Sequence, residues 1–423
     1  MAVHFKIFGA TGGFRICLSL ICAFQIAAVQ TATAQNFSSV TVQPSSAVWQ
    51  LGSSETLRIG FDDLNDGGLA LRYRLQHCNP DFTPSELRQQ ETVTGINEVN
   101  ILENELSFNT RANYVHYSFS FPSTEAYPRV SGNFLIQIYD VDNPSKYLLE
   151  IPVYIYEDLT QFEASVNVPR RVEYSRTKQE LEVTVQVKQS LPITNTANVL
   201  LLVRQNQNVR TARRIPLTSS NGNYLEFRYQ DALIFDGLNE YRNFDIRPLT
   251  YTAHGVSNNE LIDGARHITL ETDKSFRGFE YTSTDDINGQ YVIKAARQSN
   301  SDLEADYLIV HFTLQSMFVP NADVYVMGDF TQWQTSPQYK MTYDAERGEY
   351  LLDLPLKQGF YDYTYDVVRD VVRGGGSVPQ DDFTFFENTY YETENTYFLF
   401  LYYRPSGDVT HRLIGYRQIS SQK

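Results

Sequence analysis

Apolar and polar residues alternate with a period of two along most of the chain. Residues 57–61 place Leu, Ile and Phe at every second position, and residues 69–76, 115–121 and 181–187 follow the same rule. Such alternation is typical of antiparallel strands that have one face on a core and the other in water. Asn, Asp, Gly and Pro interrupt the alternating runs, and long helical periods are absent. The pattern therefore predicts an all-β protein built from β-sandwiches.

Polar breaks between these runs suggest how the chain is divided. Its 423 residues fit several modules better than one. Polar segments at 158–176 and 272–288 separate the stretches that alternate. We expect three consecutive immunoglobulin-like β-sandwich modules, over residues 36–157, 158–272 and 289–423.

The N-terminal segment has a different character. Two basic residues precede an uncharged, mostly apolar stretch at 16–29, and Ala-Thr-Ala follows at 32–34. This order is typical of a secretory signal peptide, so we expect residues 1–34 to be removed by cleavage between Ala34 and Gln35. The apolar stretch is shorter than the about 20 residues of a membrane-spanning helix, and no later stretch is long enough. We therefore predict an exported protein without a transmembrane anchor.

Composition narrows the class of partner. The chain has 29 Tyr and 26 Phe, which argues against long disorder. These rings crowd residues 361–365 and 397–403, where core packing is favoured over an exposed binding face. Asp and Glu number 50 against 35 Lys and Arg, which gives a net charge of −15. Nucleic acids and anionic membranes attract basic surfaces, so neither is expected as the main partner.

Candidate catalytic residues are sparse. Asp62 and Asp63 are adjacent, but neighbouring residues on a strand point to opposite faces, so they do not form the facing carboxylates of a glycosidase. Cys78, the only cysteine left after signal peptide cleavage, is more typical of a small buried residue than of a nucleophile. No serine-hydrolase, phosphate-loop or zinc motif occurs. We expect no catalytic, metal or cofactor site, and an unrecognised hydrolase stays an alternative.

Short blocks spread over nearly the whole chain resemble those of the type IX secretion system plug proteins of Bacteroidota. The first block, at residues 57–64, reads LRIGFDDL and is similar to the family's LxLxFDDL signature. Further blocks follow in the family's order at residues 77–87, 107–117, 131–134, 235–247, 391–395 and 402–416. The mild departures from the family pattern are Phe82, Phe134, Leu238 and Tyr241.

The resemblance implies an exported, non-enzymatic protein that acts by surface contact. Members of this family occupy the periplasmic opening of the giant SprA-type outer-membrane β-barrel translocon and keep the idle channel closed. The implied place is the periplasmic side of the outer membrane, and no cofactor, nucleic acid or small-molecule substrate is expected.

The same resemblance marks family signature residues with a structural or partner-binding role. They are Asp62, Asp63, His77, Cys78, Asn109, His116, Asn239, Glu240, Arg242, Asp245 and Arg404. Residues 239–245 form a dense polar cluster. A buried arginine is tolerated only when it is paired, so we expect Arg242 or Arg247 to pair with a carboxylate inside the protein.

A second resemblance is confined to the third module. Residues 324–333, which end in Trp333, and residues 359–363 are similar to the glycogen-binding type of early-set immunoglobulin-like domain. Such domains stack sugars on exposed tryptophan, which makes an exported carbohydrate-binding protein the alternative function. Trp49 is the only other tryptophan, however, and a stacking surface normally needs more than one exposed ring. A core role for Trp333 is therefore favoured.

Overall fold

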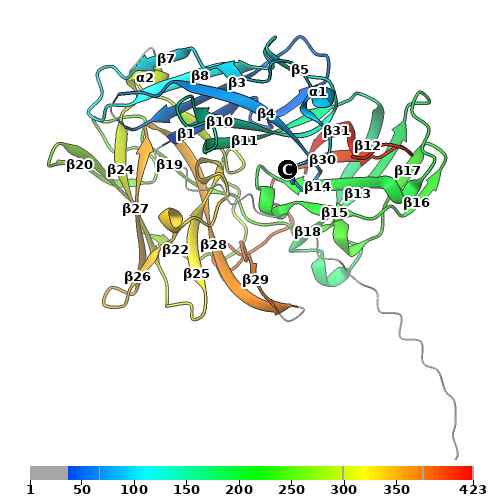
Figure 1. Cartoon of the computed structure of the whole chain (residues 1–423). Coiled ribbons are helices and arrows are strands. Elements are labelled where there is room, and N and C mark those ends of the chain that lie inside the picture. The colour runs from blue at the N-terminus through cyan, green and yellow to red at the C-terminus, as the bar shows by residue number, and fades with distance from the viewer. Residues whose placement is uncertain (1–36, 66, 298–299, 374–375, 422–423) are drawn as a thin grey trace, which may run out of the picture.

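The computed structural model describes residues 37–65, 67–297, 300–373 and 376–421, and these are almost wholly β-structure (Figure 1). The two α-helices found there, α1 (Gln89–Thr92) and α2 (Ser301–Glu304), have a single turn each, whereas 31 strands carry the fold. The predicted all-β class is confirmed. The predicted signal peptide, with its cleavage site between Ala34 and Gln35, lies outside the described residues.

The first sandwich, blue to teal in Figure 1, packs two mainly antiparallel sheets face to face. One sheet has the order β1 (Phe37–Gln43), β3 (Leu57–Asp63), β8 (Val115–Phe121) and β7 (Glu103–Leu106). The other has the order β2 (Val48–Gln50), β11 (Tyr147–Tyr156), β10 (Gly132–Asp140), β4 (Leu71–Cys78) and β6 (Val99–Asn100). A small ribbon joins β5 (Val93–Gly95) to β9 (Ala126–Pro128). The alternating apolar residues of both sheets fill the core, as their period of two requires.

The second sandwich is assembled from two distant parts of the chain. One sheet has the order β12 (Thr160–Asn167), β13 (Lys178–Val187), β17 (Tyr224–Phe227) and β16 (Ser219–Asn221), and β18 (Ile234–Asp236) also pairs with β13. The facing sheet has the order β15 (Arg213–Ile215), β14 (Val199–Gln205), β30 (Thr396–Tyr403) and β31 (Arg412–Ser420). The red C-terminal strands therefore lie beside green strands in Figure 1.

The third sandwich is inserted between β18 and β30. One sheet has the order β19 (Arg242–Asp245), β28 (Gly359–Arg373) and β23 (Tyr291–Ile293), and β25 (Asp323–Met327) and β29 (Gly376–Gln380) also pair with β28. The other has the order β20 (Val256–Ile262), β21 (Ala265–Leu270), β24 (Tyr307–Gln315), β27 (Glu349–Lys357) and β26 (Thr342–Asp344), and β22 (Asp273–Lys274) pairs with β24. Short 3-10 turns occur at Val172–Tyr174, Thr196–Asn198, Val209–Thr211, Asp231–Leu233, Asp329–Thr331 and Pro337–Tyr339.

This strand pairing corrects the predicted extent of the second and third modules. Phe244 and Ile268, which fall within the predicted second module, pack in the core of the third. Residues 396–420, which were assigned to the third, complete the second. Alternation shows that a segment is a strand but does not identify its partner, because strand pairing is a long-range contact.

An apolar junction holds the first sandwich against the second. Tyr154 of β11 stacks on Phe400 of β30 with ring centroids 4.5 Å apart, and the Tyr402 hydroxyl donates to Asn133 Oδ1 at 2.6 Å. Tyr397 and Tyr403, on the same strand, face the core of the second sandwich instead. Both faces of β30 are therefore buried, which confirms core packing for this aromatic run.

None of the helices in the described part of the chain has the length and apolar character that crossing a membrane requires.

Candidate functional site

The junction between the first and third sandwiches is polar and centres on a buried ion pair. Lys357, at the end of β27, lies with its Nζ 2.6 Å from Asp62 Oδ2 on β3, and the two side chains are 2% and 1% exposed. Asp62 also accepts hydrogen bonds from Tyr307 Oη at 2.7 Å and from His116 Nδ1 at 2.7 Å. His116 is the partner of Asp62 across the β3–β8 ladder, so the sheet register itself brings these two signature residues together.

Lys357 is enclosed by groups that compensate for its burial. Its Nζ donates to the Asp302 carbonyl at 2.7 Å and lies 4.1 Å from the centroid of the Tyr114 ring. Burial lowers the pKa of Lys357 below its usual value, although the charge of Asp62 opposes this shift. A buried charge of either sign is costly without its partner, so this ion pair couples the two sandwiches.

Further hydrogen bonds close the same junction. The amides of Arg111 and Ala112 donate to Asp306 Oδ1 at 3.0 and 3.1 Å. The Tyr114 hydroxyl donates to the Ala305 carbonyl at 2.9 Å, and the Tyr291 hydroxyl donates to the Val40 carbonyl at 2.6 Å. These contacts link the β7–β8 turn and β1 of the first sandwich to the third.

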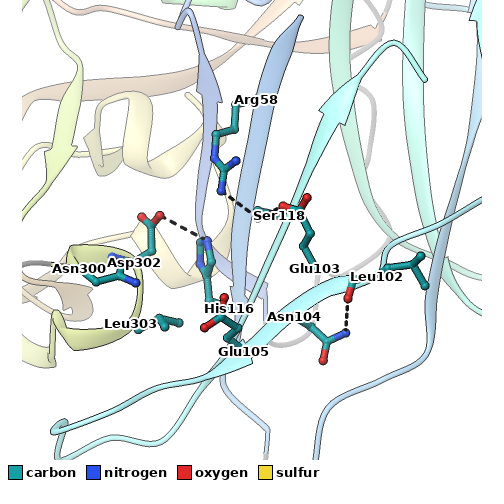
Figure 2. Close-up of a pocket in the computed structure, with 10 residues that line it drawn as sticks. All are labelled: Arg58, Leu102, Glu103, Asn104, Glu105, His116, Ser118, Asn300, Asp302 and Leu303. Carbon is teal, nitrogen blue, oxygen red and sulfur yellow. Dashed lines mark hydrogen bonds and ion pairs between the residues drawn. The ribbon is translucent and has the colours of Figure 1, made fainter. Parts of the chain in front are cut away.

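A groove opens beside this junction on the outer face of the β3–β8–β7 sheet (Figure 2). Its volume is about 330 Å³, and it is lined by Arg58, Leu102, Glu103, Asn104, Glu105, His116, Ser118, Asn300, Asp302 and Leu303. Three of these residues carry a carboxylate. Arg58 donates to Ser118 Oγ at 3.1 Å, and His116 Nε2 lies 3.9 Å from Asp302 Oδ2. The groove is therefore a polar, mainly acidic surface.

The charged groups at the junction are bonded to one another. Asp62 is bonded to Lys357, Tyr307 and His116, and the other nitrogen of His116 lies near Asp302. Across the residues that the structure describes, no group of three or more His, Cys, Asp or Glu could hold a metal ion. The buried ion pair at the junction couples the two sandwiches.

The predicted polar cluster at 239–245 lies where the chain passes from the second sandwich to the third. Arg242 Nη1 is 2.7 Å from Asp273 Oδ1, and Arg242 Nη2 is 2.9 Å from Glu387 Oε2. The expected pairing of a buried arginine is thus observed. Asn239 Nδ2 donates to the Glu387 carbonyl at 3.1 Å, and Glu240 accepts from the Tyr281 hydroxyl.

The remaining members of this cluster and its neighbours have local contacts. Asp245 pairs with Arg247 at 2.6 Å, two residues away. Arg404 donates from its backbone amide to the Asn198 carbonyl at 3.2 Å and lies in the turn that follows β30. Asn109 has a positive φ of 59° in the exposed β7–β8 turn, a conformation that asparagine tolerates better than most residues.

Three signature residues of the first sandwich, Asp63, His77 and Cys78, are buried within it. Asp63 points away from Asp62 and accepts from the Asn65 amide at 3.0 Å. His77 is buried with Nδ1 2.7 Å from Ser85 Oγ, and burial lowers its pKa to about 4. Cys78 is a free buried thiol, and burial raises its pKa to about 12, so it is not an activated nucleophile.

The tryptophans are not available as a sugar-stacking surface. Trp333 and Trp49 are each 2% exposed. Trp333 packs against Tyr241 and Phe383, with ring centroids 6.1 and 6.5 Å away. The favoured core role of Trp333 is confirmed. The alternative of a carbohydrate-binding protein depended on an exposed Trp333, and this side chain is buried.

Sequence reasoning did not identify the partners of the signature residues. In β27, Lys357 lies on the same face of the strand as the exposed Asp353 and Pro355. The alternation of apolar and polar residues in this strand therefore predicts a solvated Lys357 side chain. It is buried only because the first sandwich covers that end of the strand. Glu387 and Asp273, which pair with Arg242, likewise lie far from it in the chain.

Comparisons with known proteins give one family match and one solved structure of similar fold. Residues 26–157 match the family described as type 9 secretion system plug protein 1st domain. A hypothetical protein from Parabacteroides merdae ATCC 43184, solved by crystallography, is 29% identical, with a TM-score of 0.86 over 92% of this chain and 98% of that chain. A BSP domain of a biofilm-associated protein is 7% identical over 91% of this chain and 59% of that chain, and its TM-score of 0.18 carries no argument. No curated protein matches the chain.

Proposed function

We propose that this protein is a plug of the outer-membrane translocon, because residues 26–157 match the family described as type 9 secretion system plug protein 1st domain. It would enter the periplasmic opening of a giant SprA-type β-barrel and close the idle channel. The family match over the first sandwich is the observation that carries this proposal. It would act in the periplasm, on the inner side of the outer membrane, after removal of the predicted signal peptide.

The junctions between the sandwiches support this role. A plug must keep its shape while it closes a wide opening, so its domains cannot move freely. Here the first sandwich is joined to the third through the buried Asp62–Lys357 pair and to the second through Tyr154 and Phe400. Domain junctions inside one chain are commonly mobile unless they are large and well packed, and these are buried contacts.

Plug family members are non-enzymatic components, and we propose that this chain acts by binding alone. A stable interface buries about 1,200–2,000 Å² and depends on preformed surface rather than on a small pocket. The acidic net charge of −15 favours a partner surface with basic patches, and the contact should weaken with added salt where its charges are exposed.

The test joins a binding assay to a leakage assay. The tagged protein is used to retain partners from a detergent extract of outer membranes, and the gene is deleted and restored in the host. We expect retention of one very large β-barrel and, in the deletion strain, entry of a large antibiotic that the restored strain excludes. Intact permeability of the deletion strain together with no retained barrel would refute the proposal.

A further inference from the structure

The outer edge of β7 is the most open strand edge beside the groove. β7 is the last strand in the order β1–β3–β8–β7, and all four of its residues are exposed. A strand at such an edge presents one row of backbone amides and carbonyls without a partner strand. That row is a template for an added strand.

The hydrogen-bond pattern shows which backbone groups point outward. Ser107 donates from its amide to the Tyr114 carbonyl at 2.9 Å, so its backbone faces β8. Antiparallel ladders alternate, hence Glu105 also faces β8, whereas the amides and carbonyls of Asn104 and Leu106 point away from it. No backbone partner for these outward groups is found among the described residues.

The next outward amide along the same edge already has a partner. Phe108 donates from its amide to the Leu303 carbonyl at 2.9 Å, at the end of α2 in the third sandwich. The backbone at this edge is therefore able to form hydrogen bonds with a neighbouring segment, and the outward groups of β7 are the ones that remain available. A strand added there would be stopped at one end by α2.

The two faces of β7 have opposite chemistry. Glu103 and Glu105 point into the groove with Asp302, as Figure 2 shows. Leu106 lies on the other face and is 71% exposed. Phe108 and Leu102, which flank the strand, are 62% and 81% exposed, and Leu102 also borders the groove. Exposed apolar side chains gathered at one place commonly mark a binding surface.

We propose that the β7 edge docks an extended segment of the translocon by strand addition. The segment would have basic side chains on the face that meets Glu103 and Glu105, alternating with apolar side chains on the face that meets Leu106. Arg58 donates to Ser118 Oγ, which in turn donates to Glu103, and this single arginine does not balance the three carboxylates of the groove, so they attract an additional positive charge. Strand addition of this kind takes its affinity from the backbone and its specificity from alternate side chains. The assignment rests on the proposed plug function.

A protective role for the same residues makes a different prediction. Short edge strands that carry charged residues can serve to repel other strands. In that case the outward amides stay open to solvent in the complex, and changes at β7 do not weaken binding.

Three full-length variants separate these possibilities. Leu106→Pro removes an outward amide and leaves the bonds to β8 intact, because proline is tolerated at an edge where the amide faces solvent. Glu105→Lys reverses a charge in the groove. Glu163→Lys is the matched control, since Glu163 is an exposed residue of β12, an edge strand of the second sandwich. Melting temperatures confirm that each variant is folded.

Retention of the translocon from outer-membrane extract is measured for each variant. We expect Leu106→Pro and Glu105→Lys to weaken retention by about tenfold or more, which corresponds to the loss of one or two hydrogen-bonded contacts, while Glu163→Lys retains it. If Leu106→Pro fails to fold, Glu105→Lys decides. Equal retention by all variants would overturn the β7 assignment and leave the plug function intact, whereas no retention by the wild type would overturn the plug function itself.

Hydrogen exchange tests strand addition directly. In the free protein the amides of Asn104 and Leu106 should exchange fast, and in the complex they should become protected. The amides of Glu105 and Ser107, already bonded to β8, serve as internal references. Fast exchange at Asn104 and Leu106 in a stable complex would overturn the proposal.

Discussion

Replacing Lys357 with methionine should uncouple the first sandwich from the third. The substitution keeps an unbranched side chain, one atom shorter, and removes its charge. It leaves Asp62 buried, with only the Tyr307 hydroxyl and the His116 imidazole as partners. It also leaves the Asp302 carbonyl without the donor that lies 2.7 Å away.

Removing one partner of a buried ion pair costs about 3–5 kcal/mol, because the remaining charge stays uncompensated. The effect of an exposed pair is smaller, typically about 0–1 kcal/mol. Lys340 provides that comparison within the same sandwich, since its Nζ lies 2.7 Å from Asp323 and the two side chains are 45% and 47% exposed. Lys340→Met should therefore cost less than about 1 kcal/mol. The two substitutions differ in burial and not in chemistry.

The assay is urea unfolding followed by tryptophan fluorescence. Trp49 lies in the first sandwich and Trp333 in the third, and both are buried, so Trp49→Phe and Trp333→Phe backgrounds each report one sandwich. We expect coincident midpoints in the parent backgrounds. In Lys357→Met the midpoints should fall and separate, since the junction no longer couples the two units.

A double-mutant cycle isolates the pair itself. Asp62→Asn alone should also cost about 3–5 kcal/mol, and Asp62→Asn combined with Lys357→Met should cost no more than either change alone, because neither charge is then left unpaired. The reasoning would be refuted by additive losses in the double variant. A loss in Lys357→Met no larger than that in Lys340→Met would refute it as well.

Three further predictions concern other buried groups. Arg242→Ala should lower stability by about 3–5 kcal/mol, because Glu387 and Asp273 lose their counter-charge, and an unchanged melting temperature with lost partner binding would make this cluster an interface instead. Burial, with Asp286 nearby, raises the pKa of Asp362 from 3.8 to about 8. Between these pH values the folded state binds more protons than the unfolded state, so the free energy of unfolding falls as pH rises. Asp362→Asn should remove that slope, which reaches at most about 1.4 kcal/mol per pH unit, and parallel melting curves of the two proteins against pH would contradict this. Cys78 should resist a thiol reagent at pH 8 in the native protein and react after denaturation. The denatured, processed chain should contain one reactive thiol. Three reactive thiols would show that the segment with Cys17 and Cys22 is retained.

The strands themselves could be predicted because their cause is local. The alternation at 57–61 and 181–187 places every second side chain on one face, and burial of that face needs only a sheet, so the all-β class follows from the sequence. The blocks at 57–64 and 77–87 likewise indicated the plug family, and the match to that family's first domain covers residues 26–157. Pairing of Arg242 with carboxylates followed from the cost of burying a charge.

Only the tertiary structure determines the contacts between segments that lie far apart in the chain. The insertion of the third sandwich into the second depends on β30 pairing with β14, about 200 positions earlier, and alternation is the same whichever strand is the partner. Lys357 has the pattern of a solvated residue until the first sandwich covers it. The open edge of β7 exists only because no strand follows it in the sheet. Local pattern determines which face of a strand is apolar, but only the folded chain determines what meets the polar face, because that depends on contacts of long sequence separation.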